Sequence, residues 1–276
     1  MQNDFSIGVR FWGVRGSIPT PVADNLGYGG NTTCIEVSSP DSRLIIDLGS
    51  GARMLGQEIQ KESAGSASSL HILMTHFHWD HIQGLPFFAP LYSPGNDVTF
   101  HSSLSPEETR TIFEGHMASP YYPVKFEYMA AAKRFVGGTL ESFKLGGFDI
   151  HPFPMNHPQG ATGYRIERNG KVYVHASDLE MGDSQCDRVL REHAQNADVL
   201  VMDAQYTPSE YPSKRGWGHA TWLEAAEVAR DANVGQLVLF HHDPSHDDAF
   251  ISRMVEETRR HFENTNAARE GTAAEI

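Results

Sequence analysis

The segment Thr75–His81, which reads Thr-His-Phe-His-Trp-Asp-His, constrains this chain more than any other stretch. It places three imidazoles and one carboxylate within six consecutive positions. The apolar residues 71–74 before it are typical of a short buried strand, and the apolar residues 82–88 after it predict a helix, with Pro86 near its first turn. The motif should therefore lie at the carboxyl end of a strand, where open α/β layers place their chemistry.

The spacing of the polar side chains in this motif fits metal binding. In a loop that leaves a strand, His76 and His78 can point to the same side and hold one cation through imidazole nitrogens. Asp80 and His81 then face a neighbouring position and suit a second cation. Imidazoles with a carboxylate form a ligand set for zinc, manganese or iron. A histidine-rich surface loop is the weaker interpretation, because such loops are built mostly from Gly, Ser, Asn, Asp and Pro.

The pattern His-x-His-x-Asp-His resembles the hallmark of the metallo-β-lactamase-fold hydrolase superfamily. The resemblance implies an α/β fold, a four-layer αββα sandwich, with a one- or two-metal site at one edge. A length of 276 residues with 39% hydrophobic content allows a large core. We expect a single metallo-β-lactamase-like domain over residues 1–263. Residues 264–276 are small and polar, and we expect them to form a flexible tail.

Three later positions match the remaining metal ligands of the superfamily. His157 follows a predicted hairpin strand and matches the third histidine. Asp178 ends a strand and matches the bridging aspartate, with a helix N-cap as its alternative role. His241 follows the apolar strand 237–240 and matches the last ligand; His242 is the alternative, because a one-residue slip reverses which side chain faces inward. The resemblance thus implies two divalent metal ions, zinc or else manganese or iron, held by seven residues: His76, His78, Asp80, His81, His157, Asp178 and His241.

The second half of the chain resembles the phosphodiesterase branch of this superfamily, which includes tRNase Z and the cyclic-nucleotide and phosphonate-pathway phosphodiesterases. The resemblance rests on Gly-His-Ala-Thr at 218–221, before an Ala-rich helix, and on the apolar strand that runs into His241. It implies that His219 contacts the scissile phosphate or protonates the leaving oxygen, and that Asp203 orients His219. Asp80 is a third catalytic candidate, because it can accept a hydrogen bond from the attacking water.

We therefore predict a metal-dependent hydrolase, a phosphodiesterase that acts on a small phosphodiester or a cyclic nucleotide through a metal-activated hydroxide. Activity as a tRNA 3′-end endonuclease is one alternative. Against it, the chain lacks the long Gly/Pro-rich basic insertion of tRNase Z, and residues 240–244 differ from the Thr-His-Phe-Ser ending usual there. Hydrolysis of a β-lactam, lactone or thioester is another alternative, but it leaves His219 and Asp203 unexplained. A flavo-di-iron oxidoreductase would need Glu in place of an early His, and a non-catalytic scaffold would lack ligands.

The net charge of −13 limits the choice of partners. An acidic chain without a basic block repels extended polyanions, which disfavours long nucleic acid and favours a small phosphodiester. No run of about 18 apolar residues predicts a membrane span. Met1–Asp4 lacks the features of a secretory signal, and Cys34 and Cys186 are far apart, so we expect a cytoplasmic protein with reduced thiols. The superfamily resemblance alone implies a homodimer.

Three further positions have two interpretations each. Arg15, in a glycine-rich turn, either lies near the substrate or belongs to ordinary turn chemistry. Tyr121 and Tyr122 either stack against a base or a second subunit, or they pack within their own loop. Asp47 either orients a ligand imidazole or caps its own turn.

Overall fold

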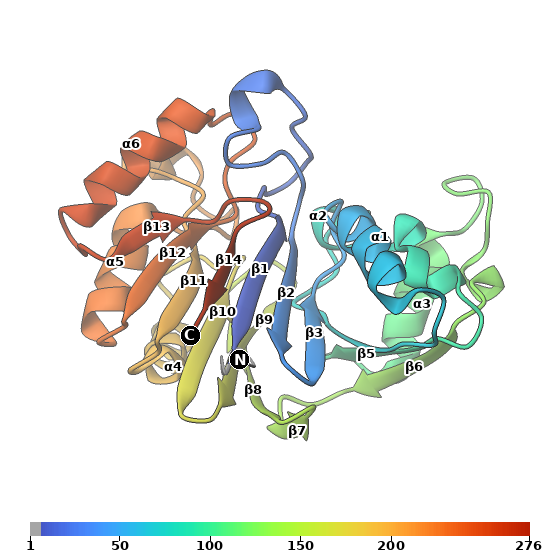
Figure 1. Ribbon diagram of the computed structural model, residues 1–276. Coiled ribbons are helices and arrows are strands. Elements are labelled where there is room, and N and C mark those ends of the chain that lie inside the picture. The colour runs from blue at the N-terminus through green and yellow to red at the C-terminus, as the bar shows by residue number, and fades with distance from the viewer. Residues whose placement is uncertain (1–6) are drawn as a thin grey trace.

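Two mixed sheets of seven strands each form the centre of the computed structural model, which describes residues 7–276 (Figure 1). In spatial order, the first sheet contains β14 (Ala273–Glu275), β1 (Gly8–Gly13), β2 (Cys34–Ser39), β3 (Ser42–Ile46), β4 (Ser69–Leu73), β5 (Asp97–Ser102) and β6 (Ala132–Gly137). The second contains β13 (Thr265–Ala267), β12 (Gln236–Phe240), β11 (Val199–Asp203), β10 (Lys171–Ala176), β9 (Ala161–Arg168), β8 (Phe148–Met155) and β7 (Phe143–Leu145). Met1–Asp4, the basis for predicting no secretory signal, lies outside the described residues.

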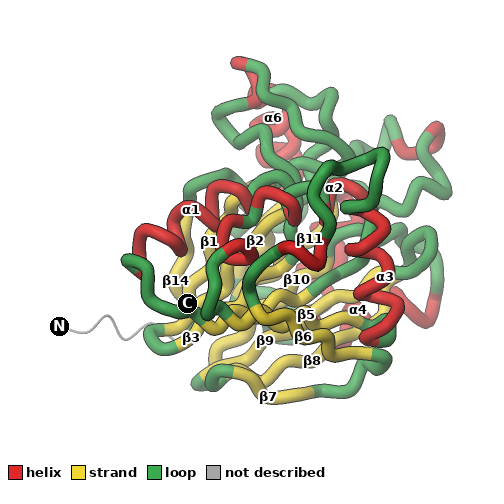
Figure 2. Tube along the Cα trace, turned by 90° about the vertical axis from the view of Figure 1, so that its right-hand side faces the viewer, coloured by secondary structure: helices red, strands yellow, loops and turns green. Residues whose placement is uncertain are grey.

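Helices cover the outer face of each sheet (Figures 1 and 2). The first sheet carries α1 (Ala52–Ser63), α2 (Trp79–Ile82) and α3 (Pro106–His116), and the second carries α4 (Ser184–Ala194), α5 (Trp222–Asp231) and α6 (Asp248–Arg259). The layers therefore follow the order helix, sheet, sheet, helix, and the predicted four-layer αββα sandwich is confirmed. No helix in the described part of the chain is long and apolar enough to cross a membrane.

The alternation of side chains along the central strands supplies the core on both faces of a sheet. In β12, Leu237 and Leu239 pack against the helices, whereas Val238 and Phe240 pack between the two sheets. Successive side chains of a strand point to opposite faces, so a strand buried on both sides needs a continuous apolar run. This explains why the strand 237–240 was recognisable from the sequence.

Two local signals are confirmed. Ser105 caps α3: its hydroxyl accepts a hydrogen bond from the Glu108 backbone N–H, and the Glu108 carboxylate accepts one from the Ser105 backbone N–H. The predicted turn Asn169-Gly170 joins β9 to β10, with φ of 52° and 78° at its two residues. Such positive values are what a two-residue hairpin turn requires.

The helix predicted to begin at 82 is wrong. The segment forms only the single turn α2, followed by short 3₁₀ turns at Leu85–Phe87 and Ala89–Tyr92. Pro86 and Pro90 fall inside this stretch, and each removes a backbone donor that a continuous helix would need. The apolar pattern was a correct sign of burial, because Ile82 and Leu91 are inaccessible, but it did not determine the helix.

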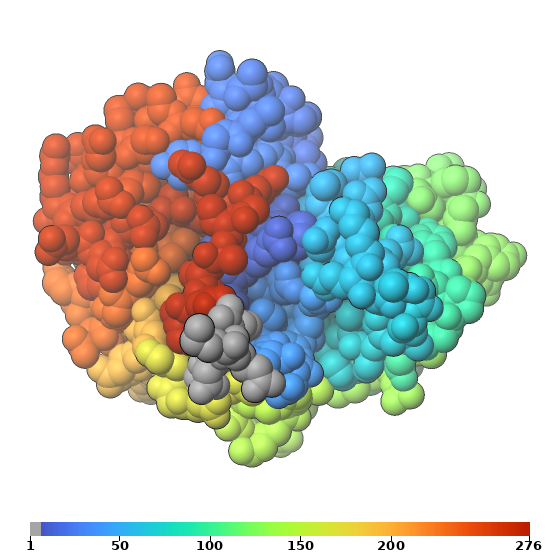
Figure 3. Space-filling model, in the orientation of Figure 1, coloured from blue at the N-terminus to red at the C-terminus, as the bar shows by residue number. Residues whose placement is uncertain are grey.

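The flexible tail expected over 264–276 is also wrong. β13 pairs in parallel with β12, and β14 pairs antiparallel with β1, so the segment completes one edge of each sheet (Figure 1). In the space-filling view, the red C-terminal segment lies against the body of the molecule (Figure 3). Thr265 and Ala268 are almost fully buried. Strands of three residues with small side chains carry no recognisable pattern, and the pairing comes from edge strands that are distant in sequence.

Ala268→Asp tests the ordered tail. The added carboxylate would lie unpaired in the inter-sheet core, so we expect the free energy of unfolding to fall by about 3 kcal/mol. Urea denaturation followed by circular dichroism measures the change. Ala273→Asp, at an exposed position of β14, is the matched control and should unfold at nearly the native urea concentration. Equal midpoints for the two variants would mean that the tail is not packed.

Candidate metal centre

The seven candidate ligands lie in the segments that follow four strands, with Asp80 and His81 in α2, and these strands end at the same edge of the sandwich. The motif follows β4, His157 follows β8, Asp178 follows β10 and His241 follows β12. Their ligand atoms form two groups, within each of which all atoms lie within 4.8 Å of one another. The first group is His76, His78 and His157, and the second is Asp80, His81, Asp178 and His241.

Left-handed backbone aims three of the side chains at this centre. Asp47, Asp178 and His241 have φ of 59°, 65° and 61°, and each lies within two residues of a strand end. Asp and His tolerate this region better than most residues, although it is sparsely populated. Such conformations persist where the surroundings determine them and are concentrated at functional sites.

The first group contains imidazole nitrogens that receive no hydrogen bond from a donor group. His157 donates its Nδ1 proton to the Gly218 carbonyl at 2.8 Å, and His78 Nε2 contacts the Gln159 Oε1 acceptor at 3.1 Å. His157 Nε2 lies 3.1 Å from His78 Nδ1, and both nitrogens offer lone pairs when each neutral ring carries its proton on the other nitrogen; His76 Nε2 is buried with no hydrogen-bond partner. Burial lowers the pKa of His76 and of His157. Neutral rings with converging lone pairs fit a cation.

The carboxylate of Asp178 lies between the two groups. Its Oδ1 is 3.2 Å from His241 Nε2 and 3.9 Å from His76 Nε2, and its Oδ2 is 3.2 Å from His81 Nε2. Asp80 Oδ2 lies 3.1 Å from His241 Nε2 and 3.4 Å from His81 Nε2. One carboxylate that faces both groups can link two cations.

The electrostatics of the second group also fit a cation. Burial raises the pKa of Asp178, but the imidazoles of His241 and His81 outweigh it and hold that pKa well below its usual range. Burial lowers the pKa of His81, and the carboxylates of Asp178, Asp80 and Asp47 raise it above its usual range. The buried carboxylates thus attract positive charge, which a divalent ion can supply in place of protons.

Hydrogen bonds from neighbouring residues orient the ligand rings. The Asp47 carboxylate accepts a hydrogen bond from His81 Nδ1 at 2.7 Å and from the Thr75 backbone N–H at 2.8 Å, which supports its orienting role over a turn cap. Gln205 Oε1 accepts one from His241 Nδ1 at 2.8 Å. Gln205 and Gln159 were not predicted from the sequence, where the one signal is the position of Gln205 two residues after Asp203.

His219 and Asp203 form a buried pair beside the second group. His219 Nδ1 donates to Asp203 Oδ2 at 2.8 Å, and its ring stacks on that of His241 with centroids 4.9 Å apart. Asp203 also accepts hydrogen bonds from the backbone N–H groups of Ala220 and Asp178, both at 3.1 Å. Burial lowers the pKa of His219, but Asp203 raises it to about 9.

Two candidates lie away from both ligand groups. His242 donates from Nε2 to the Ala268 carbonyl at 3.0 Å and packs edge-on to Tyr28, so the structure brings His241, not His242, to the centre. Arg15 is fully buried and donates to the carbonyls of Gly29 and His246 at 2.7 and 2.6 Å. It joins loops and does not line the rim.

The two tyrosines of this loop, Tyr121 and Tyr122, have different environments. Tyr121 is 78% exposed, whereas Tyr122 packs edge-on against Phe87 with ring centroids 6.0 Å apart. The contact of Tyr122 is ordinary loop packing. Within the described part of the chain, the exposed Tyr121 side chain makes no ring contact and no hydrogen bond.

Asp80→Ala tests the second group directly. Because it removes one of four ligands there, we expect the purified protein to retain about one metal equivalent where the native chain holds two. Atomic emission spectroscopy measures the metal content and also identifies the metal. Asp149→Ala, at a half-exposed carboxylate of β8 that pairs with Lys144, is the control and should leave the content unchanged. Two equivalents retained by Asp80→Ala would remove this residue from the centre.

A family model, a relative in sequence and two solved structures all point to the same protein family. A model of the beta-lactamase superfamily domain matches residues 42–242. Ribonuclease Z from Thermoplasma acidophilum is 26% identical, over 94% of this chain and 93% of that protein. The metallo-β-lactamase fold protein YhfI from Bacillus subtilis has a TM-score of 0.77 at 19% identity and covers 99% of this chain and 100% of its own. The short form of human tRNase Z has a TM-score of 0.61 at 18% identity, over 97% and 98% of the two chains.

The family model covers most of the chain, including both ligand groups, Asp203 and His219. The chain therefore belongs to the metallo-β-lactamase superfamily, in its ribonuclease Z and phosphodiesterase-like branch, and is a metal-dependent hydrolase.

Proposed function

We propose that this protein hydrolyses phosphodiester bonds and that an RNA 3′ end is the first substrate class to test. The observation that carries the proposal is the His219–Asp203 pair, which lies beside the candidate metal centre and can serve a poor leaving oxygen. Relatives named ribonuclease Z match nearly the whole chain, which supports the endonuclease alternative better than the small phosphodiester predicted first.

The ligand groups assign the roles of the residues around two divalent cations. His76, His78 and His157 would hold one, Asp80, His81 and His241 would hold the other, and Asp178 would contact both, as the following distances support: 3.9 Å to His76, and 3.2 Å to each of His81 and His241. When bound, such cations lower the pKa of an attacking water and polarise the phosphoryl oxygens.

The protein's own groups provide the proton transfers. Asp203 fixes the tautomer and orientation of His219, so that Nε2 donates its proton to the leaving oxygen. The carboxylate of Asp203 raises the pKa of His219, which favours the protonated ring that this role requires. The Ser17 backbone N–H donates to Asp80 Oδ2 at 2.8 Å, which holds this carboxylate where it can accept a hydrogen bond from the attacking water.

A small phosphodiester, including a cyclic nucleotide, is the second candidate. The net charge of −13 favours it, because a long polyanion would be repelled over much of the surface. A β-lactam, lactone or thioester is less well supported, because the relatives that match nearly the whole chain carry the name ribonuclease Z.

His219→Ala tests the proton donor. We expect the variant to keep both metals and to lose about 10²–10⁴ in rate on an alkyl ester, because the leaving alkoxide is no longer protonated. The loss should shrink for a nitrophenyl ester, whose leaving group needs no proton. Steady-state rates on both substrates, with metal content as the control, measure this. Equal losses on both substrates would exclude the acid role.

A substrate panel tests the reaction class. We expect the metal-loaded protein to cleave bis(4-nitrophenyl) phosphate together with either precursor tRNA or a cyclic mononucleotide, and to leave nitrocefin intact. Cleavage of precursor tRNA at the 3′ side, weakened strongly by added salt, would favour the RNA substrate. Rapid nitrocefin hydrolysis without any phosphodiester cleavage would contradict the proposal.

A further inference from the structure

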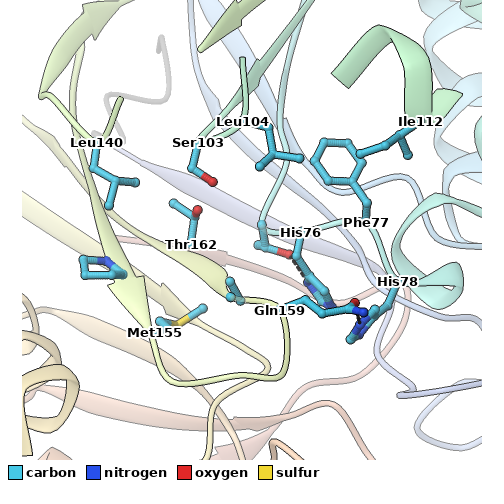
Figure 4. A pocket seen from close by; sticks show the side chains of 14 residues that line it. His76, Phe77, His78, Ser103, Leu104, Ile112, Leu140, Met155, Gln159 and Thr162 are labelled. Atoms are coloured by element: carbon cyan, nitrogen blue, oxygen red, sulfur yellow. Dashed lines mark hydrogen bonds between the residues drawn. The ribbon is translucent and has the colours of Figure 1, made fainter. Parts of the chain in front are cut away.

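An apolar pocket of about 520 Å³ opens beside the first ligand group (Figure 4). His76 and His78 form part of its wall, and the rest comes from the loops after β5 and β6, from α3, and from the turn between β8 and β9. The backbone N–H of Thr162 donates to the Thr75 carbonyl at 2.9 Å, so this wall is fixed directly to the first residue of the histidine motif. The volume is in the range of small-molecule sites.

The lining selects for an uncharged group. Its side chains are mostly apolar and include the following: Phe77, Leu104, Ile112, Leu140, Pro154 and Met155. The hydroxyls of Ser103 and Thr162 lie on the same space, and the described lining contains no Lys, Arg, Asp or Glu. A few polar atoms in an apolar wall are typical of sites that orient a flat ring. A second phosphate would find no cation to pair with here.

His219 is separate from the pocket wall. The described lining includes His76 and His78 but neither His157 nor His219. The His157 ring contacts the His78 ring, with centroids 4.9 Å apart, and also the His219 ring, with centroids 5.5 Å apart, so it links the pocket wall to His219. A phosphodiester held at the centre would therefore direct one ester group towards His219 and the other towards the pocket.

We propose that this pocket binds the ester group that remains on phosphorus, and that this group is uncharged and apolar, with an aromatic ring or nucleobase as the best fit. The inference rests on the proposed phosphodiester hydrolysis. A nucleic acid would place only a terminal nucleoside here, because the next phosphate would meet an apolar wall.

The chemistry balances without a further reactant. The water oxygen bonds to phosphorus, and the bond between phosphorus and the leaving oxygen breaks. The leaving oxygen takes the His219 proton, the attacking water releases one proton to solvent, and His219 is reprotonated from solvent. The pocket group stays in the monoester product.

The test keeps the leaving group constant. Methyl, phenyl and naphthyl 4-nitrophenyl phosphate all release 4-nitrophenol and differ only in the group that remains. We expect kcat/KM of the metal-loaded protein to rise by about tenfold or more from the methyl to the phenyl ester, because a matched apolar pocket discriminates at this level. Phenyl phosphate, the expected product, should also bind more tightly than methyl phosphate by calorimetry.

Two variants and one control assign the effect to this pocket. Leu140→Asp adds a charge at a lining residue that is 36% exposed, and Ser103→Phe fills part of the volume. Both should abolish the preference for the larger group in rate and in product binding. Leu26→Asp makes the same exchange at an exposed leucine outside the pocket and should keep the preference.

The outcomes separate the two proposals. If no ester is hydrolysed, the proposed function fails. If all three esters are hydrolysed at similar rates, or if the preference survives in both pocket variants, the function stands and the pocket assignment is overturned. A second series of esters would keep the remaining group constant and vary the leaving group. If the preference for a larger group appears in that series instead, the pocket assignment is also overturned.

Discussion

The buried carboxylate of Asp178 is the constraint on which the rest of the site depends. An ionised carboxylate so deeply enclosed needs positive charge, and His81 and His241 each bring a ring nitrogen to 3.2 Å from it. Those rings are in turn held by Asp47 and Gln205, each through a hydrogen bond to Nδ1. Every nitrogen at the centre is thus directed inward by a partner on its far side, which is how proteins fix metal-ligating histidines.

One short loop joins the two halves of the chemistry. The Gly218 carbonyl accepts the His157 Nδ1 proton, and the next residue is His219. The Glu180 carboxylate in turn accepts hydrogen bonds from the backbone N–H groups of Gly216 and Gly218. The partner of a candidate ligand of the first group and the proposed proton donor therefore share one backbone segment. This arrangement couples the position of His219 to the geometry of the first group through the backbone.

The sequence predicted what depends on pattern and missed what depends on partners. The strand 237–240, the Ser105 cap and the Asn169-Gly170 turn carry local chemistry that is sufficient to recognise them. The motif histidines carry a residue-type signal strong enough to group them before any contact is known. The paired strands in 264–276 depend on edges that are distant in sequence, and nothing local marks them.

The site shows the same division. Gln205 orients His241 only because two strand ends lie side by side, and a lone glutamine has no recognisable motif. Arg15 had two interpretations, a position near the substrate or ordinary turn chemistry, and the structure instead buries its guanidinium, which donates to the backbone carbonyls of Gly29, His246 and Asn25. Burial of this kind follows from tertiary packing and not from composition.

The left-handed backbone at Asp47, Asp178 and His241 implies that function and stability favour different residues at these positions. Glycine adopts this conformation without steric cost, so at these three positions the residue best suited to the backbone is one that carries no ligand or orienting group. Selection for a robust apoprotein and selection for a competent centre therefore pull in opposite directions at the same sites. A homologue that had lost its chemistry would be free to relax there first, and glycine at these positions would be a mark of that loss.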